Sequence, residues 1–206
     1  MPIAILSFLL AAAALLAASS TAAANPEDCT QLRDRARAIA ACSEVIAANS
    51  GTPRDLAVAY FYRGSARALD GKYQDAIADL TRAIELDPNY TAAYANRGRS
   101  YASLGDFASA LADFNTALSL TPKDPKILKN RANAYLQLKD ADKALGDYLE
   151  LASLTSEDAF VVFRIAVMYE DRKDLVNAAI WYKKALKLRP GDVSIIDALK
   201  RVGGTP

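Results

Sequence analysis

Apolar and small side chains recur along most of this chain at spacings of three and four residues. In residues 91–103 this spacing joins Ala93, Tyr94, Gly98, Tyr101 and Ala102. It is interrupted after residue 104 and resumes in residues 107–118. Such spacing places the apolar groups on one face of an α-helix. The pattern therefore predicts pairs of helices, each with one buried face, joined by short breaks.

The whole pattern repeats with a constant period of 34 residues. The blocks 57–90, 91–124, 125–158 and 159–192 align without a gap, and one column of small residues consists of Ala76, Ala110, Ala144 and Ala178. Pro88, Pro122 and Pro190 stand near the ends of three blocks, where proline disfavours helix at the residue before it. A period of this size indicates a stack of similar units rather than one closed core.

The repeated residues resemble those of the tetratricopeptide repeat family. The second block shows the signature best, with Tyr94, Gly98, Tyr101, Ala110, Phe114, Ala117 and Pro122. The later blocks depart from it at Ala132, Leu151, Ser156 and Ala166 but keep the period. The resemblance implies an all-α fold, a right-handed superhelical solenoid of antiparallel helix hairpins with four full repeats.

Shorter segments flank the four repeats. Residues 25–56 are expected to form a half-repeat, because Ala38–Ile46 resembles Ala76–Ile84, the start of a second helix. The four extra residues 53–56 would connect it to the first full repeat. Residues 193–206 are expected to form a capping helix and a tail, since terminal units of repeat arrays have one face without a neighbour.

The first 24 residues contain no charged side chain and end in Ala22-Ala23-Ala24. An apolar run followed by small residues is typical of a cleaved signal peptide, although this one lacks the usual basic start. The prediction is a single domain, 25–206, that is periplasmic or secreted and not stably inserted in a membrane. An uncleaved membrane anchor is the alternative, but the run is short and alanine-rich for a span of about 20 residues.

The two cysteines, Cys29 and Cys42, are expected to form a disulfide. A helix starting near Arg35 would raise Cys42 by about 10 Å, and the lead from Cys29 can span about 20 Å. Exported proteins more often pair two cysteines than leave them free. The alternative is that Cys42 is only a small buried hydrophobic residue.

One pair of columns combines opposite charges. Arg63, Arg97 and Arg131 are each followed sixteen residues later by Asp79, Asp113 and Asp147, respectively. In the fourth block both positions become apolar, as Ile165 and Trp181. This joint change predicts an ion pair within each of the first three hairpins, because charges near a core usually need a partner. An arginine ladder that binds anions is the alternative.

By resemblance to the family, one face of each first helix lines a concave groove that binds peptides or partner helices. The candidate residues are Phe61, Asn96, Arg99, Lys126, Lys129, Asn130, Asn133, Phe160 and Arg164. They combine cations and amides with aromatics at both ends, which suits an extended segment with carboxylates and an apolar anchor. Some family members clamp a terminal carboxylate with Lys, Asn and Arg, but here that set is incomplete. A merely solvated polar face is therefore the alternative.

Composition narrows the function further. The chain has a formal net charge of +1 and no histidine, which argues against a nucleic-acid partner and removes the usual general base and metal ligand. No catalytic or phosphate-binding motif is present, so the expectation is a non-enzymatic protein without metal or cofactor. The predicted function is a monomeric periplasmic adaptor for a peptide or protein, and an acidic partner would suit the cationic groove. The alternatives are a self-associating envelope scaffold and a non-catalytic subunit of an envelope enzyme.

Overall fold

A computed structural model describes residues 26–49, 51–155 and 158–205 of the chain. The predicted signal peptide lies outside these residues. The described part contains the short 3-10 helix η1 and ten α-helices, and it contains no strand. Their bounds are η1 (Pro26–Thr30), α1 (Arg35–Ala48), α2 (Pro53–Leu69), α3 (Tyr73–Leu86), α4 (Thr91–Ser103), α5 (Phe107–Leu120), α6 (Pro125–Gln137), α7 (Ala141–Leu154), α8 (Ala159–Asp171), α9 (Leu175–Leu188) and α10 (Val193–Arg201).

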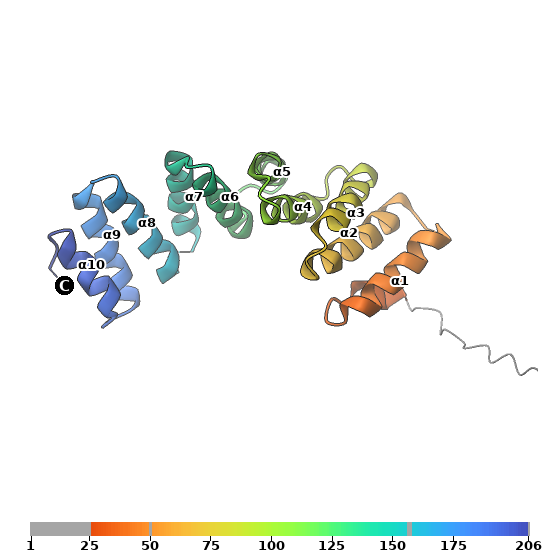
Figure 1. The fold of residues 1–206 in the computed structure, drawn as a ribbon, viewed down its shortest axis with the longest axis horizontal. Coiled ribbons are helices and arrows are strands. Elements are labelled where there is room, and N and C mark those ends of the chain that lie inside the picture. The colour runs from red at the N-terminus through yellow and green to blue at the C-terminus, as the bar shows by residue number, and fades with distance from the viewer. Residues whose placement is uncertain (1–25, 50, 156–157, 206) are drawn as a thin grey trace, which may run out of the picture.

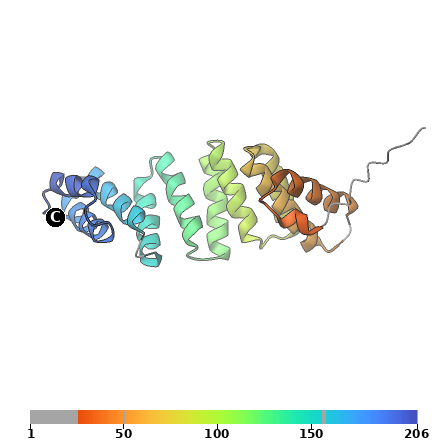
Figure 2. The same ribbon diagram turned by 90° about the horizontal axis from the view of Figure 1, so that it is seen from below.

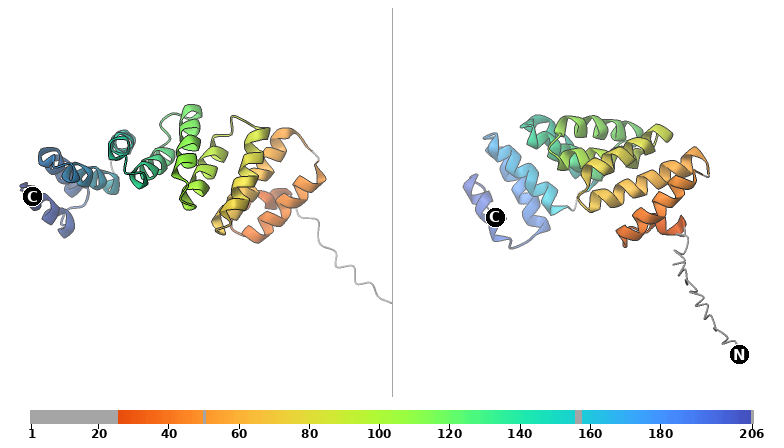
Figure 3. Two further views of the ribbon diagram at one scale, coloured as in Figure 1. Left: turned by 45° about the horizontal axis from the view of Figure 1, so that its top comes forward. Right: turned by 45° about the vertical axis from the view of Figure 1, so that its right-hand side comes forward.

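The helices follow one another in a single curved row. Figure 1 shows an arch from α1 at one end to α10 at the other, and Figure 2 shows the hairpins side by side along it. Each helix packs on the next in sequence, and α4 also contacts α2 and α6, the first helices of the neighbouring hairpins. Figure 3 shows the curvature from two further directions. The predicted all-α solenoid is confirmed.

Aspartates fix where most helices begin. Asp106, Asp140 and Asp174 stand at the start of the second helices of three hairpins, and each carboxylate accepts a hydrogen bond from the backbone N–H three residues later. These bonds satisfy N–H groups that the first turn of a helix leaves open. Hydrogen bonds from the side chains of Ser109, Lys143 and Asn177, together with those from their backbone N–H groups, lower the pKa of the three aspartates. The helix starts expected from the sequence are thus set by local capping.

The connection expected at residues 53–56 is helical. Pro53 occupies the first turn of α2, where its missing N–H costs no hydrogen bond. Thr52 and Asp55 form a reciprocal capping box just before and within that turn. The extra residues therefore lengthen α2 instead of forming a loop.

Small residues let the two helices of each hairpin approach closely. Ala76, Ala110, Ala144 and Ala178 are all fully buried. A Cβ on Gly98 would lie 2.8 Å from Cε1 of the buried Phe114, which is too close for carbon atoms to stay in place. The small columns of the repeat are therefore a steric requirement of the hairpin.

Both ends of the array are closed by short segments. At the start, η1 is linked to α1 by the predicted disulfide between Cys29 and Cys42, both of which are buried. At the other end, α10 packs on α9 and buries Ile195 and Leu199 in the core shared with α8 and α9. These segments shelter apolar faces that would otherwise lack a neighbouring repeat.

Candidate protein-binding groove

The arginine and aspartate columns meet inside the first three hairpins. Each arginine donates two hydrogen bonds to one carboxylate, at 2.9 and 2.7 Å for Arg63–Asp79, 2.8 and 2.8 Å for Arg97–Asp113, and 2.9 and 2.6 Å for Arg131–Asp147. The three aspartates are buried. These hydrogen bonds raise the pKa of each arginine above its ordinary value.

Each arginine also reaches the preceding unit. Nη1 donates to a polar side chain of the previous second helix, namely Ser43 at 3.1 Å, Thr81 at 3.0 Å and Asn115 at 2.8 Å. One guanidinium therefore joins three helices, and all of its nitrogens point at protein atoms. This geometry favours a structural role over the anion-binding ladder.

The fourth hairpin replaces this polar arrangement with an apolar one. Ile165 stands in the arginine column and is fully buried. Leu149, in the column of Thr81, and Trp181, in the aspartate column, pack against the same core cluster. All three polar partners have thus changed together, which keeps the packing complete without a buried charge.

The surface is hollowed where α4 contacts α2 and α6, the first helices of the neighbouring hairpins. Figure 1 shows α4 on the inner side of the arch, below α5. One hollow, of about 350 Å³, is lined by residues that include Ser65, Tyr73, Asn96, Arg99, Ser100 and Ser103. A second, of about 390 Å³, is lined by residues that include Arg99, Ser103, Phe107, Asn130, Asn133 and Gln137. Arg99 and Ser103 border both, so the hollows form one continuous groove. We call this surface, defined by the two sets of lining residues, the α4 groove.

The α4 groove presents hydrogen-bonding groups and a positive charge. Asn96 donates from Nδ2 to Oγ of Ser65 at 2.8 Å, which fixes its amide across α2 and α4. Arg99 is exposed between the hollows, and its Nη1 lies 3.5 Å from Oδ1 of Asn96. Neither set of lining residues includes an aspartate or a glutamate.

A second set of predicted residues gathers between α6 and α8. Nζ of Lys129 lies 5.1 Å from the ring centre of Phe160, a cation–π contact on an exposed ring. Nearby, the hydroxyl of Tyr148 donates to Oδ1 of Asn133 at 2.7 Å. Burial raises the pKa of Tyr148, and the positive charge of Arg164 opposes that rise. In the described part of the chain, the buried Nε of Arg164 has no hydrogen-bond partner.

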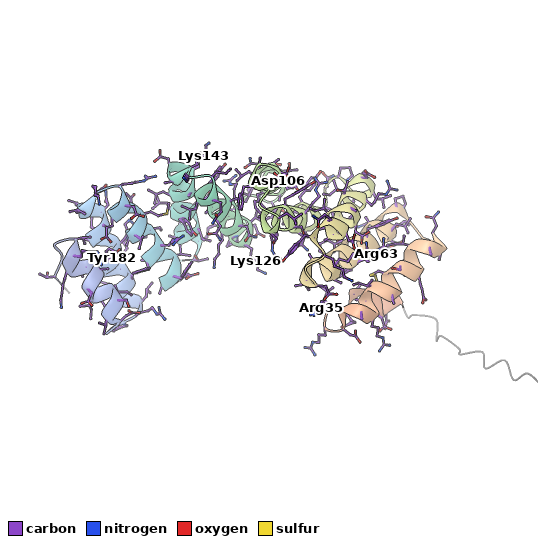
Figure 4. All side chains as sticks on the ribbon, in the orientation of Figure 1. Arg35, Arg63, Asp106, Lys126, Lys143 and Tyr182 are labelled. Carbon is purple, nitrogen blue, oxygen red and sulfur yellow. A yellow bond between two sulfur atoms is a disulfide. The ribbon has the colours of Figure 1, made fainter. Side chains whose placement is uncertain are left out.

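Two predicted residues lie outside these clusters. Phe61 packs against Tyr62 and Tyr90, with ring centres 5.2 and 4.8 Å apart, and so contributes to the core between α2 and α3. Lys126 is exposed at the first turn of α6, on the inner side of the arch in Figure 4, whereas Asp106 and Lys143 lie on its outer side. The structure therefore brings together Asn96, Arg99, Asn130 and Asn133, with Lys129, Phe160 and Arg164 beside them.

Some lining residues were not expected. Ser100, Ser103 and Gln137 border the groove, and Leu32 extends it toward the segment held by the disulfide. The serines and Gln137 follow Asn96, Arg99 and Asn133 at intervals of four, so helical periodicity could have identified them. Leu32 has no equivalent in the other repeats, and only its position in the fold reveals it.

The charges of this region are unbalanced. Arg99, Lys126, Lys129 and Arg164 form no ion pair with any of the residues that the structure describes. Cations that lack a carboxylate partner among the described residues attract carboxylates of another molecule. Within the described residues, no helix is long and apolar enough to cross a membrane, and no group of His, Cys, Asp or Glu could hold a metal ion.

Comparisons with known proteins agree with the fold. Family models described as tetratricopeptide or TPR repeats match residues 64–105, 95–159 and 161–192. A crystal structure of MamA is similar with a TM-score of 0.72 and 21% identity, covering 82% of this chain and 96% of that one. A crystal structure of YrrB, described as a TPR protein with an unusual peptide-binding site, has a TM-score of 0.70 and 17% identity over 85% of this chain and 88% of its own. A comparison with curated proteins gives no match.

Proposed function

This chain belongs to the tetratricopeptide repeat family, and we propose that it is a non-enzymatic adaptor that docks an extended, acidic segment of a partner protein in the α4 groove. The observation that carries the proposal is the continuity of the two hollows around Arg99. Their lining combines amides, hydroxyls and one guanidinium without any carboxylate. A surface of this kind complements an extended chain with carboxylate side chains.

The chemistry of the lining suits backbone recognition. An extended peptide has N–H and C=O groups that need partners once water is displaced. The amides of Asn96, Asn130 and Asn133 can each donate and accept, so they can serve both groups. Arg99 in the middle and Lys129 and Arg164 beyond α6 would then select carboxylates along the segment.

The hairpins hold this surface in place before a partner arrives. Three Arg–Asp pairs link successive helices, and the Asn96–Ser65 hydrogen bond orients one groove amide. A rigid surface loses less conformational entropy on binding, which improves affinity for a given contact area. The mechanism is therefore the display of ordered groups, with no chemical step.

The proposal places the adaptor outside the reducing cytoplasm, in the periplasm or secreted, as a monomer. It rests on the uncharged, alanine-ending leader and on the disulfide between Cys29 and Cys42. Disulfides persist in oxidising compartments and are rare in the cytosol. N-terminal sequencing of the protein recovered from cells tests the leader, with Asn25 as the expected first residue and Met1 as the contrary result.

In-cell photo-crosslinking tests the docking function. A photoreactive residue at Ser103, in the groove, is compared with one at Ser119, an exposed serine on the outward-facing α5. We expect adducts from position 103 whose mapped site lies in an extended acidic segment, and few from position 119. Adducts that arise only from position 119 would count against the proposal.

A combined variant provides the second arm of this test. Lys129→Ala, Asn130→Ala and Arg164→Ala together remove two cations and one amide from the groove region, and we expect the adducts from position 103 to disappear. Lys143→Ala, on the outer side of the arch, is the control and should leave them unchanged. Equal adduct yields in the combined variant and the control would contradict the assignment.

A further inference from the structure

The outer face of α9 is unlike that of the earlier second helices. Its exposed residues Val176, Ile180, Lys183, Lys184 and Lys187 lie within an arc of roughly 100°, because successive helix residues are separated by about 100°. Val176 and Ile180 are 73% and 47% exposed, although both are aliphatic. The helix contains three lysines and no acidic residue. We call these five residues the α9 face.

The repeat itself does not require this composition. The positions of Val176 and Ile180 hold Gln74 and Ala78 in α3, Ala108 and Ala112 in α5, and Asp142 and Gly146 in α7. The position of Lys187 holds Glu85, Ser119 and Ser153. Three earlier hairpins thus form with small or polar residues there. The apolar and basic residues of the fourth are therefore not needed for packing.

Two hollows flank the C-terminal half of α9. One, of about 580 Å³, lies between α9 and α10 and is lined by residues that include Lys183, Leu186, Lys187 and Ile196. The other, of about 330 Å³, is lined by residues that include Val162, Trp181, Lys184, Lys187 and Leu188. Lys187 borders both, so α9 forms a ridge between two largely apolar depressions with basic rims.

This ridge carries a net positive charge. In the structure as described, Lys183, Lys184 and Lys187 form no ion pair, and Nζ of Lys184 lies over the ring of Trp181 at 3.9 Å. Neither hollow is lined by an acidic residue. A partner with carboxylates on either side of an apolar stripe would complement both features.

We propose that the α9 face is a second docking surface, separate from the α4 groove, for an acidic amphipathic helix of a partner protein. From Val176 to Lys187 the ridge rises about 16 Å, which matches three turns of a helix. Ridges of one helix pack into the depressions beside another, so apolar side chains of the partner would enter the two hollows. Its glutamates or aspartates would then meet the three lysines. A bilayer surface is flat and would leave both depressions unfilled.

Trp181 provides the readout, because it is the only tryptophan in the chain and it borders one hollow. The probe is a synthetic helical peptide of about 18 residues with leucines at spacings of three and four, flanked by glutamates. The control peptide has glutamine at every glutamate position. We expect the glutamate peptide to change Trp181 emission in a saturable manner and to bind at least about tenfold more tightly than the glutamine peptide.

The chain supplies its own matched variant. The changes V176A, I180A, K183N, K184T and K187S install the residues that α5 carries at the same positions, so the hairpin should still form. Circular dichroism checks that helix content is retained. Binding of the glutamate peptide should fall by at least about tenfold, whereas the groove variant Lys129→Ala, Asn130→Ala, Arg164→Ala should bind it normally. Failure of the groove proposal and failure of this one are thereby distinguished.

A charge reversal tests the complementarity itself. Lys183→Glu, Lys184→Glu and Lys187→Glu together should lose the glutamate peptide and gain a peptide with lysine in place of glutamate. Equal binding of the glutamate and glutamine peptides would overturn the proposal. So would anionic phosphatidylglycerol vesicles that change Trp181 emission when the peptide does not, or a dimer in sedimentation that the α5-like variant abolishes. Those last two outcomes would assign the face to a lipid surface or to a second copy of the chain.

Discussion

Removal of one partner from a buried Arg–Asp pair should destabilise the array far more than replacement of both. Arg97 and Asp113 are the best pair to test, because their side chains are only 17% and 7% exposed and because Asp79 of the first pair also binds a second arginine, Arg67. Arg97→Ile would leave a buried carboxylate without its two hydrogen bonds. Breaking a fully buried pair costs about 3–5 kcal/mol, and the partial exposure of the arginine lowers this to about 2–4 kcal/mol.

The fourth hairpin shows how the loss can be compensated. Ile165, Trp181 and Leu149 occupy the positions of Arg97, Asp113 and Thr81 and pack in one apolar cluster. The double variant Arg97→Ile, Asp113→Trp should therefore be more stable than the sum of its single changes predicts. Adding Thr81→Leu completes the apolar set and should recover more of the loss, since both charges and their polar neighbour are then replaced together.

Urea unfolding followed by circular dichroism measures these differences. The variant Arg82→Ala is the control, because Arg82 also pairs with an acidic residue, Glu85, but both side chains are about half exposed. Exposed pairs contribute little, so the control should unfold close to the parent chain. Losses of the single changes that add within about 0.5 kcal/mol in the double variant would refute the coupling between these positions.

Three further outcomes follow from the contacts. The Cys29–Cys42 disulfide closes a loop of sequence separation 13, and its reduction should destabilise the N-terminal half-repeat by about 3 kcal/mol. Hydrogen exchange should then show faster opening of α1 but not of α8. Unchanged exchange in α1 would contradict this expectation. The pKa values of Asp106, Asp140 and Asp174 are lowered in the folded chain, so their contribution to stability is present above their unfolded pKa of about 4 and is lost as the pH falls through the folded values. Replacing all three with serine should therefore flatten the dependence of melting temperature on pH below about pH 5. An unaltered slope would argue against this account of the caps. Tyr182→Phe removes the hydroxyl that donates to Glu170 at 2.6 Å and should lower stability by about 1 kcal/mol in thermal unfolding. The control is Tyr169→Phe, which removes a hydroxyl from a ring that is only half-buried and should have little effect.

Much of the fold could be predicted because the positions that determine helix packing recur in each of the four repeats. The columns of Ala76 and Gly98 recur at fixed places, and each is small for the steric reason that the structure shows. The Arg–Asp pairing was visible because both members of the pair change together in the fourth hairpin. Such repetition acts as an internal comparison within one chain.

The α4 groove was harder to predict from the sequence than the fold. Periodicity places Asn96, Arg99, Asn130 and Asn133 on one face of the first helices, and all four line the α4 groove. The ring of Phe61, which the sequence also assigns to the groove, packs against Tyr90 at the start of α4, a contact that depends on residues outside the repeat column. Leu32 and the hollow between α9 and α10 depend on how the terminal segments fold back, which no repeat encodes.

Calorimetric titration of the α4 groove tests the central claim most directly. The segment captured from position 103 is made as a synthetic peptide, once with its carboxylates and once with each replaced by the corresponding amide. We predict that the carboxylate form binds the parent chain at least about tenfold more tightly than the amide form, and that the variant Lys129→Ala, Asn130→Ala, Arg164→Ala removes this difference. Equal affinities of the two peptides for the parent chain, or the same preference in the variant, would contradict the account.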